Sequence, residues 1–382
     1  MNSEVRRAGP PQASTAPLRG SAVREATSVG AKILLVKLSS LGDVVHALPV
    51  VQDIRAAMPD AQIDWVVEKS FASLLARCPG LNRIVTCEIR RWRKSPLSAA
   101  TRQQWGAFKA DLQQTRYDAV IDLQGLTKSA VVARLARLAP GGKRYALANQ
   151  TEGSGYEAPT RWVADVAIRV EPHIHAVQRS RELAARALGY MLPSSPDFGL
   201  NRPSAQVKRA QTAPEKIANR VAFVHGTSRA AKEWPLAHWI ELGRRFNAAG
   251  WQVALAHGNA KEQATSRAIA GALNKSEPAN AIVWPLLPLD ALTEELAQCE
   301  GVIGVDSGVS HIAVALDLPH VQLYNFDTAW RTGPNEAAGR QVSVFSQPAP
   351  GVDAVWQAWL GCLASVKADQ PAQPAQPEAN AA

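Results

Sequence analysis

Short, wholly apolar runs alternate with helical patterns along this sequence, and this alternation limits the possible folds more than any other feature. The first run, residues 32–38, contains Ile-Leu-Leu-Val at positions 33–36 without a polar break. A continuous run of this kind is typical of a central strand in a parallel sheet that is covered on both faces. The run ends in Ser-Ser-Leu-Gly-Asp and passes into a helical pattern over residues 44–58.

The same unit of strand, loop and helix recurs in both halves of the chain. Further strands are expected at 63–68, 84–87, 118–123, 221–224, 253–256, 282–284, 302–305 and 320–324. Further helices are expected at 71–77, 128–138, 176–188, 235–249, 261–273, 290–298 (with Asp290 as its N-terminal cap), 308–316 and 354–366. This order predicts an α/β protein with two Rossmann-like, doubly wound domains that face each other across a cleft.

A Pro- and Ser-rich stretch at 192–213 has the composition of a linker and divides the chain into its two halves. Ligands bind such sheets at the carboxyl ends of the strands, so the loops there are the candidate sites. The boundaries that we expect are a flexible N-terminal tail (1–31), a first domain (32–190), a linker (191–215), a second domain (216–350), a C-terminal helix (351–367) and a disordered C-terminal tail (368–382).

The composition is that of a globular protein, with 46% hydrophobic and 20% charged residues among 382. No apolar run reaches the roughly 18–20 residues that span a bilayer, and no secretory signal is evident, so we expect a cytoplasmic protein. The four cysteines form neither a zinc pattern nor a Cys-x-x-Cys motif. The net charge of +9 arises in the first half, which indicates contact with a polyanion or an anionic membrane, or else a solvated basic surface.

The loop Ser39-Ser40-Leu41-Gly42-Asp43 lies where the first strand meets the first helix. Backbone N–H groups at such a helix start favour anions. Asp43 is either a helix cap or a carboxylate at the floor of the cleft that takes a proton from an acceptor hydroxyl. The loop has no Gly-x-Gly-x-x-Gly or Gly-Lys-Ser/Thr pattern, which argues against dinucleotide and P-loop nucleotide sites.

Two strand-end loops of the second half have the residue types of a nucleotide site. One begins at His225 and contains Thr227, Ser228 and, further on, Lys232, whose hydroxyl and ammonium groups suit a diphosphate. The other is Asp306-Ser307-Gly308-Val309-Ser310-His311, which begins a helix and suits a ribose and a phosphate. Taken alone, His311 more often has a structural role, and a solvated Lys232 is the plain alternative.

The run Arg90-Arg91-Trp92-Arg93-Lys94 places four cations within five residues. It is short and has one aromatic residue, so it does not fit a nucleic-acid surface. A clamp for an anionic substrate accounts for it, and a solvated charged surface remains the alternative.

Together these segments resemble the lipopolysaccharide heptosyltransferases of glycosyltransferase family 9, and most of all those that add the first heptose. The resemblance covers most of residues 32–325 and is carried by the combination of SSLGD, RRWRK and VDSGVSH together with YDAVIDLQGLTKS at 117–129. It implies the GT-B fold and an inverting transfer of L-glycero-D-manno-heptose from ADP-heptose to the Kdo of Kdo2-lipid A. The stretch 141–160 and the segment 324–327 depart from the family pattern.

The resemblance also implies a role for individual residues. Asp43 would be the catalytic base, and Lys232 would assist departure of ADP. Donor binding is assigned to Thr227, Ser228, Lys232, Asp306, Ser307, Gly308, Val309 and His311. Acceptor binding is assigned to Ser39, Ser40, Gly42, Arg90, Arg91, Arg93, Lys94, Gln124 and Lys128.

We expect no essential metal, because no Asp-x-Asp pair stands at a strand end, and no cofactor besides the donor substrate ADP-heptose. The expected partners are ADP-heptose, Kdo2-lipid A and, peripherally, the cytoplasmic face of an anionic inner membrane, with no nucleic acid. The alternatives are a heptosyltransferase II, another GT-B nucleotide-sugar enzyme such as an epimerase, and a non-catalytic anion-binding protein. Affinity for ADP separates the last of these from the others.

Overall fold

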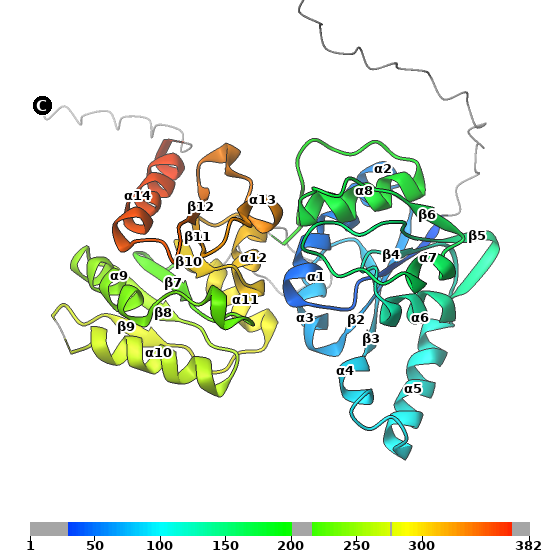
Figure 1. The fold of residues 1–382 in the computed structure, drawn as a ribbon, viewed down its shortest axis with the longest axis horizontal. Coiled ribbons are helices and arrows are strands. Elements are labelled where there is room, and N and C mark those ends of the chain that lie inside the picture. The colour runs from blue at the N-terminus through cyan, green and yellow to red at the C-terminus, as the bar shows by residue number, and fades with distance from the viewer. Residues whose placement is uncertain (1–29, 201–215, 276, 369–382) are drawn as a thin grey trace, which may run out of the picture.

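The computed structural model describes residues 30–200, 216–275 and 277–368, and it forms two α/β domains side by side (Figure 1). The expected tails and most of the expected linker lie outside the described residues. Each domain is built on one parallel six-stranded sheet with helices packed on its faces, so the predicted pair of Rossmann-like domains is confirmed.

The first sheet has the strand order β3-β2-β1-β4-β5-β6. Its central strand pairs in parallel with both neighbours, with Leu34 opposite Asp64 on one side and Val120 on the other. The strands are β1 (Lys32–Val36), β2 (Gln62–Glu68), β3 (Leu81–Cys87), β4 (Arg116–Asp122), β5 (Arg137–Leu147) and β6 (Val166–Ile168). The helices are α1 (Leu41–Ala47), α2 (Pro49–Ala57), η1 (Lys69–Phe71), α3 (Ala72–Leu75), α4 (Ile89–Trp92), α5 (Ala99–Leu112), α6 (Thr127–Leu135), α7 (Pro159–Val163) and α8 (Ala176–Leu188).

The second sheet repeats the plan in the order β12-β11-β10-β7-β8-β9. Its strands are β7 (Arg220–Val224), β8 (Gln252–Leu255), β9 (Ala281–Val283), β10 (Gly301–Val305), β11 (His320–Tyr324) and β12 (Gln341–Phe345). Its helices are η2 (Ala230–Lys232), α9 (Leu236–Ala248), α10 (Ala260–Leu273), α11 (Leu289–Ala297), α12 (Gly308–Ala315), α13 (Ala329–Thr332), η3 (Glu336–Ala338) and α14 (Val352–Ala368).

The C-terminal helix α14 is part of the second domain. Its residues Val355, Trp359 and Cys362 are buried in the same core as Phe223 and Phe246 of that domain. The Trp359 ring meets that of Phe246 edge to face, with ring centroids 5.4 Å apart. The segment that the sequence set apart as 351–367 therefore closes one face of the second sheet.

Some expected elements differ from the structure. The helix expected at 128–138 ends at Leu135, because the Arg144 guanidinium donates to the carbonyls of Ala133 and Ala136 at its end. The chain then turns directly into the long strand β5, which the sequence did not predict. Gly142 permits this, because a Cβ atom there would lie 2.5 Å from the carbonyl oxygen of Tyr117 on the neighbouring strand.

Other boundaries shift for local reasons. The single helix expected over 44–58 is two helices, because Pro49 begins a second one directly after the first. Asp290 lies inside the first turn of α11, whose cap is Pro288. The sequence did not predict α4, α5, α7, α13, β6 or β12.

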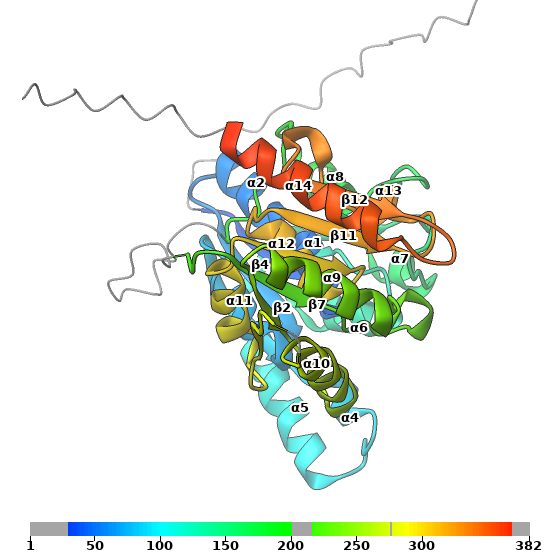
Figure 2. The same cartoon turned by 90° about the vertical axis from the view of Figure 1, so that its left-hand side faces the viewer.

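The two domains meet along α1 and α12, which pack closely on one another near the middle of the molecule (Figures 1 and 2). A cross-domain ion pair lies beside them, with 2.8 Å between Arg77 on the first domain and Glu294 on α11. The loops at the carboxyl ends of β1 and β10, which carry the candidate chemistry, are thereby brought together.

Candidate active site

A cleft of about 310 Å³ lies between the domains, and residues of both line it. From the first domain it takes the sequence-predicted residues Ser40, Gly42, Asp43 and Gln124. From the second it takes Ser228, Lys232, Asp306, Ser307, Gly308 and His311. Residues predicted from loops far apart in the sequence therefore share one cavity.

Asp43 is the third residue of α1, where it completes a capping box with the N-cap residue Ser40, and it also faces the cleft. It stands in the first turn of α1, where its Oδ2 accepts hydrogen bonds from the Ser40 backbone N–H at 3.0 Å and the Ser40 hydroxyl at 2.7 Å. Its Oδ1 lies 3.7 Å from the ammonium group of Lys37 and 3.9 Å from the guanidinium group of Arg179. The capping bonds hold one oxygen, which leaves the other directed at the cleft and its cations.

The pKa of Asp43 follows from this setting. Burial by itself raises it, but the Lys37 charge, the two Ser40 hydrogen bonds and the Arg179 charge outweigh burial and lower the pKa to about 2. Asp43 is therefore ionised at any neutral pH. Burial also lowers the pKa of Lys37, to about 8, although the nearby Asp43 charge raises it.

The loop before Asp43 is held by the end of β4. The side-chain oxygen of Gln124 accepts the backbone N–H of Leu38 at 2.8 Å, and its amide nitrogen donates to the carbonyl of Ser39 at 2.7 Å. Lys128 donates to the Ser39 hydroxyl at 2.7 Å. Ser39 and Lys128 therefore lie behind the cleft lining, and Gln124 fixes the loop as well as lining the cavity.

Two glycines allow the helix starts of the two domains to approach. A Cβ atom on Gly42 would lie 2.8 Å from the imidazole of His311, and one on Gly308 would lie 2.8 Å from Leu41. Since real Cβ atoms do not come this close, only glycine fits at either position without a shift. The first N–H groups of each helix lack partners within the helix, and the crossing turns both sets toward one cavity.

The wall contributed by the second domain is organised around Asp306 at the end of β10. Its carboxylate pairs with Lys232 through one oxygen, while the other lies 3.4 Å from His311 Nε2. Although burial opposes it, the charges of His311 and Lys232 and their hydrogen bonds hold the pKa of Asp306 far below its ordinary range. Thr227 donates from its hydroxyl to the Asp306 carbonyl at 3.4 Å, which places it behind the lining. Val309 is partly buried and packs on the core.

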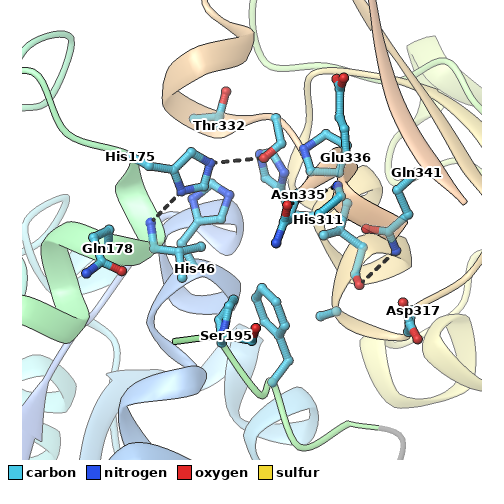
Figure 3. A pocket seen from close by; sticks show the side chains of 18 of the residues that line it. His46, His175, Gln178, Ser195, His311, Asp317, Thr332, Asn335, Glu336 and Gln341 are labelled. Atoms are coloured by element: carbon cyan, nitrogen blue, oxygen red, sulfur yellow. Dashed lines mark hydrogen bonds between the residues drawn. The ribbon is translucent and has the colours of Figure 1, made fainter. Parts of the chain in front are cut away.

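Three imidazoles from both domains meet beside the cleft (Figure 3). The His46 ring lies 4.1 Å from that of His311 and 6.1 Å from that of His175, centroid to centroid. His175 accepts the Val177 N–H through Nδ1 at 3.2 Å, so its Nε2 carries the hydrogen that it donates to the Gly333 carbonyl at 3.0 Å. Burial lowers the pKa of both His46 and His175, so these two rings pack in the neutral form.

The imidazoles also border a second cavity of about 870 Å³, which runs toward α13 and β12. It shares His46, His311 and Thr332 with the first cavity. The histidine cluster is thus the partition between the two spaces.

The cationic run at 90–94 does not line the cleft. Its first member, Arg90, lies over the ring of Phe71 at 5.8 Å and donates its backbone N–H to Glu68 at 3.1 Å, while Arg91 pairs with Glu88 at 2.7 Å. Arg93 and Lys94 are exposed. Residues 90–94 therefore form a basic surface outside the cleft, which we call the shelf. Its inner end, Arg90, lies within electrostatic range of Lys128.

The comparisons with known proteins agree with one another. The model of glycosyltransferase family 9 (heptosyltransferase) matches residues 105–356. Lipopolysaccharide heptosyltransferase 1 of Pseudomonas aeruginosa is 39% identical over 300 residues, which cover 77% of this chain and 78% of that protein. Lipopolysaccharide heptosyltransferase 1 of Escherichia coli K12 is 35% identical over 298 residues, covering 77% of this chain and 87% of that protein. The chain belongs to glycosyltransferase family 9.

The likeness extends to three dimensions. The E. coli heptosyltransferase WaaC with ADP superimposes with a TM-score of 0.74 at 30% identity, covering 85% of this chain and 98% of that one. The chain is therefore a glycosyltransferase, a heptosyltransferase of lipopolysaccharide biosynthesis, and the predicted family and GT-B architecture are confirmed.

Four cations that line the cleft of this heptosyltransferase were not assigned to it from the sequence: Arg229, which follows Ser228 directly, and Lys37, Arg179 and Arg331. Lys37 belongs to the SSLGD segment, where its place at the end of an apolar strand was an available signal. Arg179 lies on α8 and is buried, with a hydrogen bond to Thr151 at 3.1 Å. Arg331 comes from α13 and contacts the Gly153 carbonyl of the first domain. The last two carry no local pattern, because only the folded chain brings them to Asp43.

No cluster of three His, Cys, Asp or Glu side chains suited to a metal ion occurs in the described part of this heptosyltransferase. The four cysteines are free and buried.

Proposed function

We propose that this heptosyltransferase moves L-glycero-D-manno-heptose from ADP-heptose to the Kdo of Kdo2-lipid A, in one inverting displacement. The observation that carries the proposal is the placement of the ionised Asp43 carboxylate in the same cavity as Lys232, Asp306 and His311. A base for an acceptor hydroxyl and a cationic wall for a diphosphate thus face one another across the cleft.

On the donor side, we assign ADP to the second domain. Lys232 and the N–H groups at the start of α12 are the donors directed at the diphosphate, and Ser228 and Ser307 add hydroxyl groups. In the structure Lys232 is paired with Asp306, so that Asp306 holds the ammonium group in place before the donor arrives. Donors aimed at the charge that develops on the leaving ADP lower the barrier most.

On the acceptor side, Asp43 receives the proton of the attacking hydroxyl. An acid with a pKa of about 2 has little affinity for a proton, so the transfer proceeds together with formation of the glycosidic bond rather than before it. Lys37 and Arg179 keep Asp43 ionised and orient its free oxygen. Ser40, Gly42 and Gln124 position the acceptor beside it, and Arg90, Arg91, Arg93 and Lys94 guide its anionic groups from the shelf.

The proposed chemistry requires no metal or cofactor besides the donor substrate. The cations of the cleft supply the positive charge that a divalent ion supplies in other transferases. No helix among the described residues is long and apolar enough to cross a membrane. We propose that the enzyme works in the cytoplasm and contacts the anionic inner membrane peripherally, where its lipid acceptor resides.

The similar proteins of P. aeruginosa and E. coli are both heptosyltransferases 1, and this favours the first heptose over the second. The test is release of ADP from ADP-heptose with two acceptors, Kdo2-lipid A and the same molecule already carrying one heptose. We expect turnover with the first and little with the second. The reverse preference would identify a heptosyltransferase II, and ADP binding without turnover on either acceptor would contradict the proposal.

A further inference from the structure

The α4–α5 hairpin, residues 89–112, projects from the first domain beyond the rest of the molecule (Figures 1 and 2). All eight residues from 93 to 100 are exposed. Leu97 lies at the turn between the helices and is 82% exposed. A leucine this exposed at the tip of a projection contributes little to the core of its own fold.

From residue 89 to residue 110, the charged residues of the hairpin are all basic. These are Arg90, Arg91, Arg93, Lys94, Arg102 and Lys109, and the one acidic residue of the hairpin is Asp111, near the end of α5. Arg91 is the member paired with a carboxylate, that of Glu88 at the base. Basic residues around an exposed apolar side chain fit a surface that is anionic outside and apolar beneath.

The hairpin is rigid enough to present its tip. Trp92 is buried and donates from its indole to Gln104 at 3.0 Å, which ties α4 to α5. The rings of Trp92, Trp105 and Phe108 pack on each other with centroids 5.5 to 5.7 Å apart. The aromatic residue within the cationic run therefore anchors α4 to α5, and Arg91 donates to the same Gln104 oxygen.

The base of the hairpin leads into the cleft. Arg90 is bonded through its backbone to Glu68 at the end of β2, and Lys128, which bonds Ser39, lies within electrostatic range of Arg90. The base of the hairpin therefore lies near the acceptor side of the cleft, and the tip projects away from it.

We propose that the α4–α5 hairpin docks on an anionic phospholipid bilayer, with Leu97 inserted among the acyl chains and the cations on the headgroups. The inference rests on the proposed function, because it supplies the contact by which a lipid-anchored acceptor reaches Asp43. The proposed partner is the bilayer. A basic projection with one exposed leucine matches a surface that is anionic outside and apolar beneath, whereas a soluble anion would leave the leucine without an apolar partner.

The test is sedimentation of the full chain, without substrates, with vesicles of phosphatidylcholine alone or in an equal mixture with phosphatidylglycerol. We expect binding to the anionic vesicles only, weakened by salt. Leu97→Asp should reduce the affinity roughly tenfold, equivalent to about 1.4 kcal/mol, because it removes the buried apolar side chain and repels the headgroups. ADP affinity should be unchanged, which checks that the variant is folded.

The matched control is Leu286→Asp, which alters a leucine of the second domain that is 65% exposed. It should bind anionic vesicles as the unaltered chain does. Equal loss in both variants, no loss in Leu97→Asp, equal binding to neutral vesicles, or complete displacement by single-stranded nucleic acid would overturn the docking proposal. Because none of these measurements uses a donor or acceptor, failure here is distinct from failure of heptose transfer, which a detergent-dispersed acceptor tests separately.

Discussion

At the scale of single residues, Asp43 combines a place in the capping box of α1 with the position that we propose for the catalytic base. The sequence offered both interpretations of this carboxylate, and the structure realises the cap through Ser40 while leaving Oδ1 beside Lys37 and Arg179. The pattern Ser-x-x-Asp could be recognised from the sequence. The two cations could not be assigned, because Arg179 is far from Asp43 in the sequence and reaches the site only through the packing of α8.

The free energy of unfolding at acid pH tests the environment of Asp43. Because its pKa is lowered from 3.8 to about 2, folding favours the ionised carboxylate. This contribution is complete above the ordinary pKa and is lost as the pH falls toward about 2. In urea unfolding, we expect the unaltered chain to exceed Asp43→Asn in stability at pH 5 and the difference to shrink toward pH 3. A difference independent of pH would contradict the lowered pKa.

Lys232 is predicted to act on the departing ADP. Lys232→Met should lower kcat by about 10²–10³-fold, the usual effect of removing one donor to developing negative charge. It should also weaken ADP binding, measured by calorimetry. Lys261→Met is the control, since that side chain is 75% exposed and pairs with Glu233. Similar losses of kcat and of ADP affinity in both variants would mean that the effect comes from the change in net charge and not from a contact with ADP.

At the scale of elements, the sequence is most informative where one element carries its own signal. The range of α8 follows directly from the apolar periodicity of 176–188, and β1 from its unbroken apolar run. The sequence does not predict the strand β5, because Pro140, Gly141 and Gly142 interrupt its apolar pattern. Its pairing with β4 shifts register in this region. The sequence does not predict the hairpin of α4 and α5 either, because it buries few side chains, Trp92, Phe108 and Leu112 among them.

The position of α8 depends on a buried ion pair. Arg181 on α8 donates to both oxygens of Asp53 on α2, at 2.7 and 3.0 Å, and both side chains are 2% exposed. Asp53→Ala should lower the free energy of unfolding by about 3–5 kcal/mol, because it leaves a buried guanidinium without its partner. Glu182→Ala, which removes an i,i+4 partner of the half-exposed Arg186, should cost only about 0.3–0.5 kcal/mol. Equal costs in chemical denaturation would contradict this distinction.

The cationic run on and after α4 is predicted to affect the acceptor and not the donor. Changing Arg90, Arg91 and Arg93 together to Gln should raise the KM for the acceptor far more than the KM for ADP-heptose, because these side chains lie outside the cleft lining that we assign to the donor. Steady-state kinetics with each substrate varied in turn measures both. Equal increases would remove the clamp role.

At the scale of the whole molecule, the proposed division into a donor-binding and an acceptor-binding domain follows from two sheets whose strand ends meet at one cleft. The sequence predicts the two sheets, the cleft and the loops that meet there, since each depends on repeated local patterns. It does not predict the crossing of α1 and α12, where Gly42 and Gly308 are fitted to their neighbours, or the histidine cluster between the domains. Those features depend on how two separately patterned domains dock.

The most direct test of the central claim compares Asp43→Asn with the unaltered heptosyltransferase under saturating ADP-heptose and Kdo2-lipid A. The Asn side chain keeps the size of the carboxylate but cannot accept the proton, so we predict a fall in the rate of heptose transfer of about 10²–10⁴-fold with unchanged affinity for ADP. Transfer within a few-fold of the unaltered rate would show that Asp43 is only the cap of α1 and that another group, or none, takes the proton of the acceptor hydroxyl.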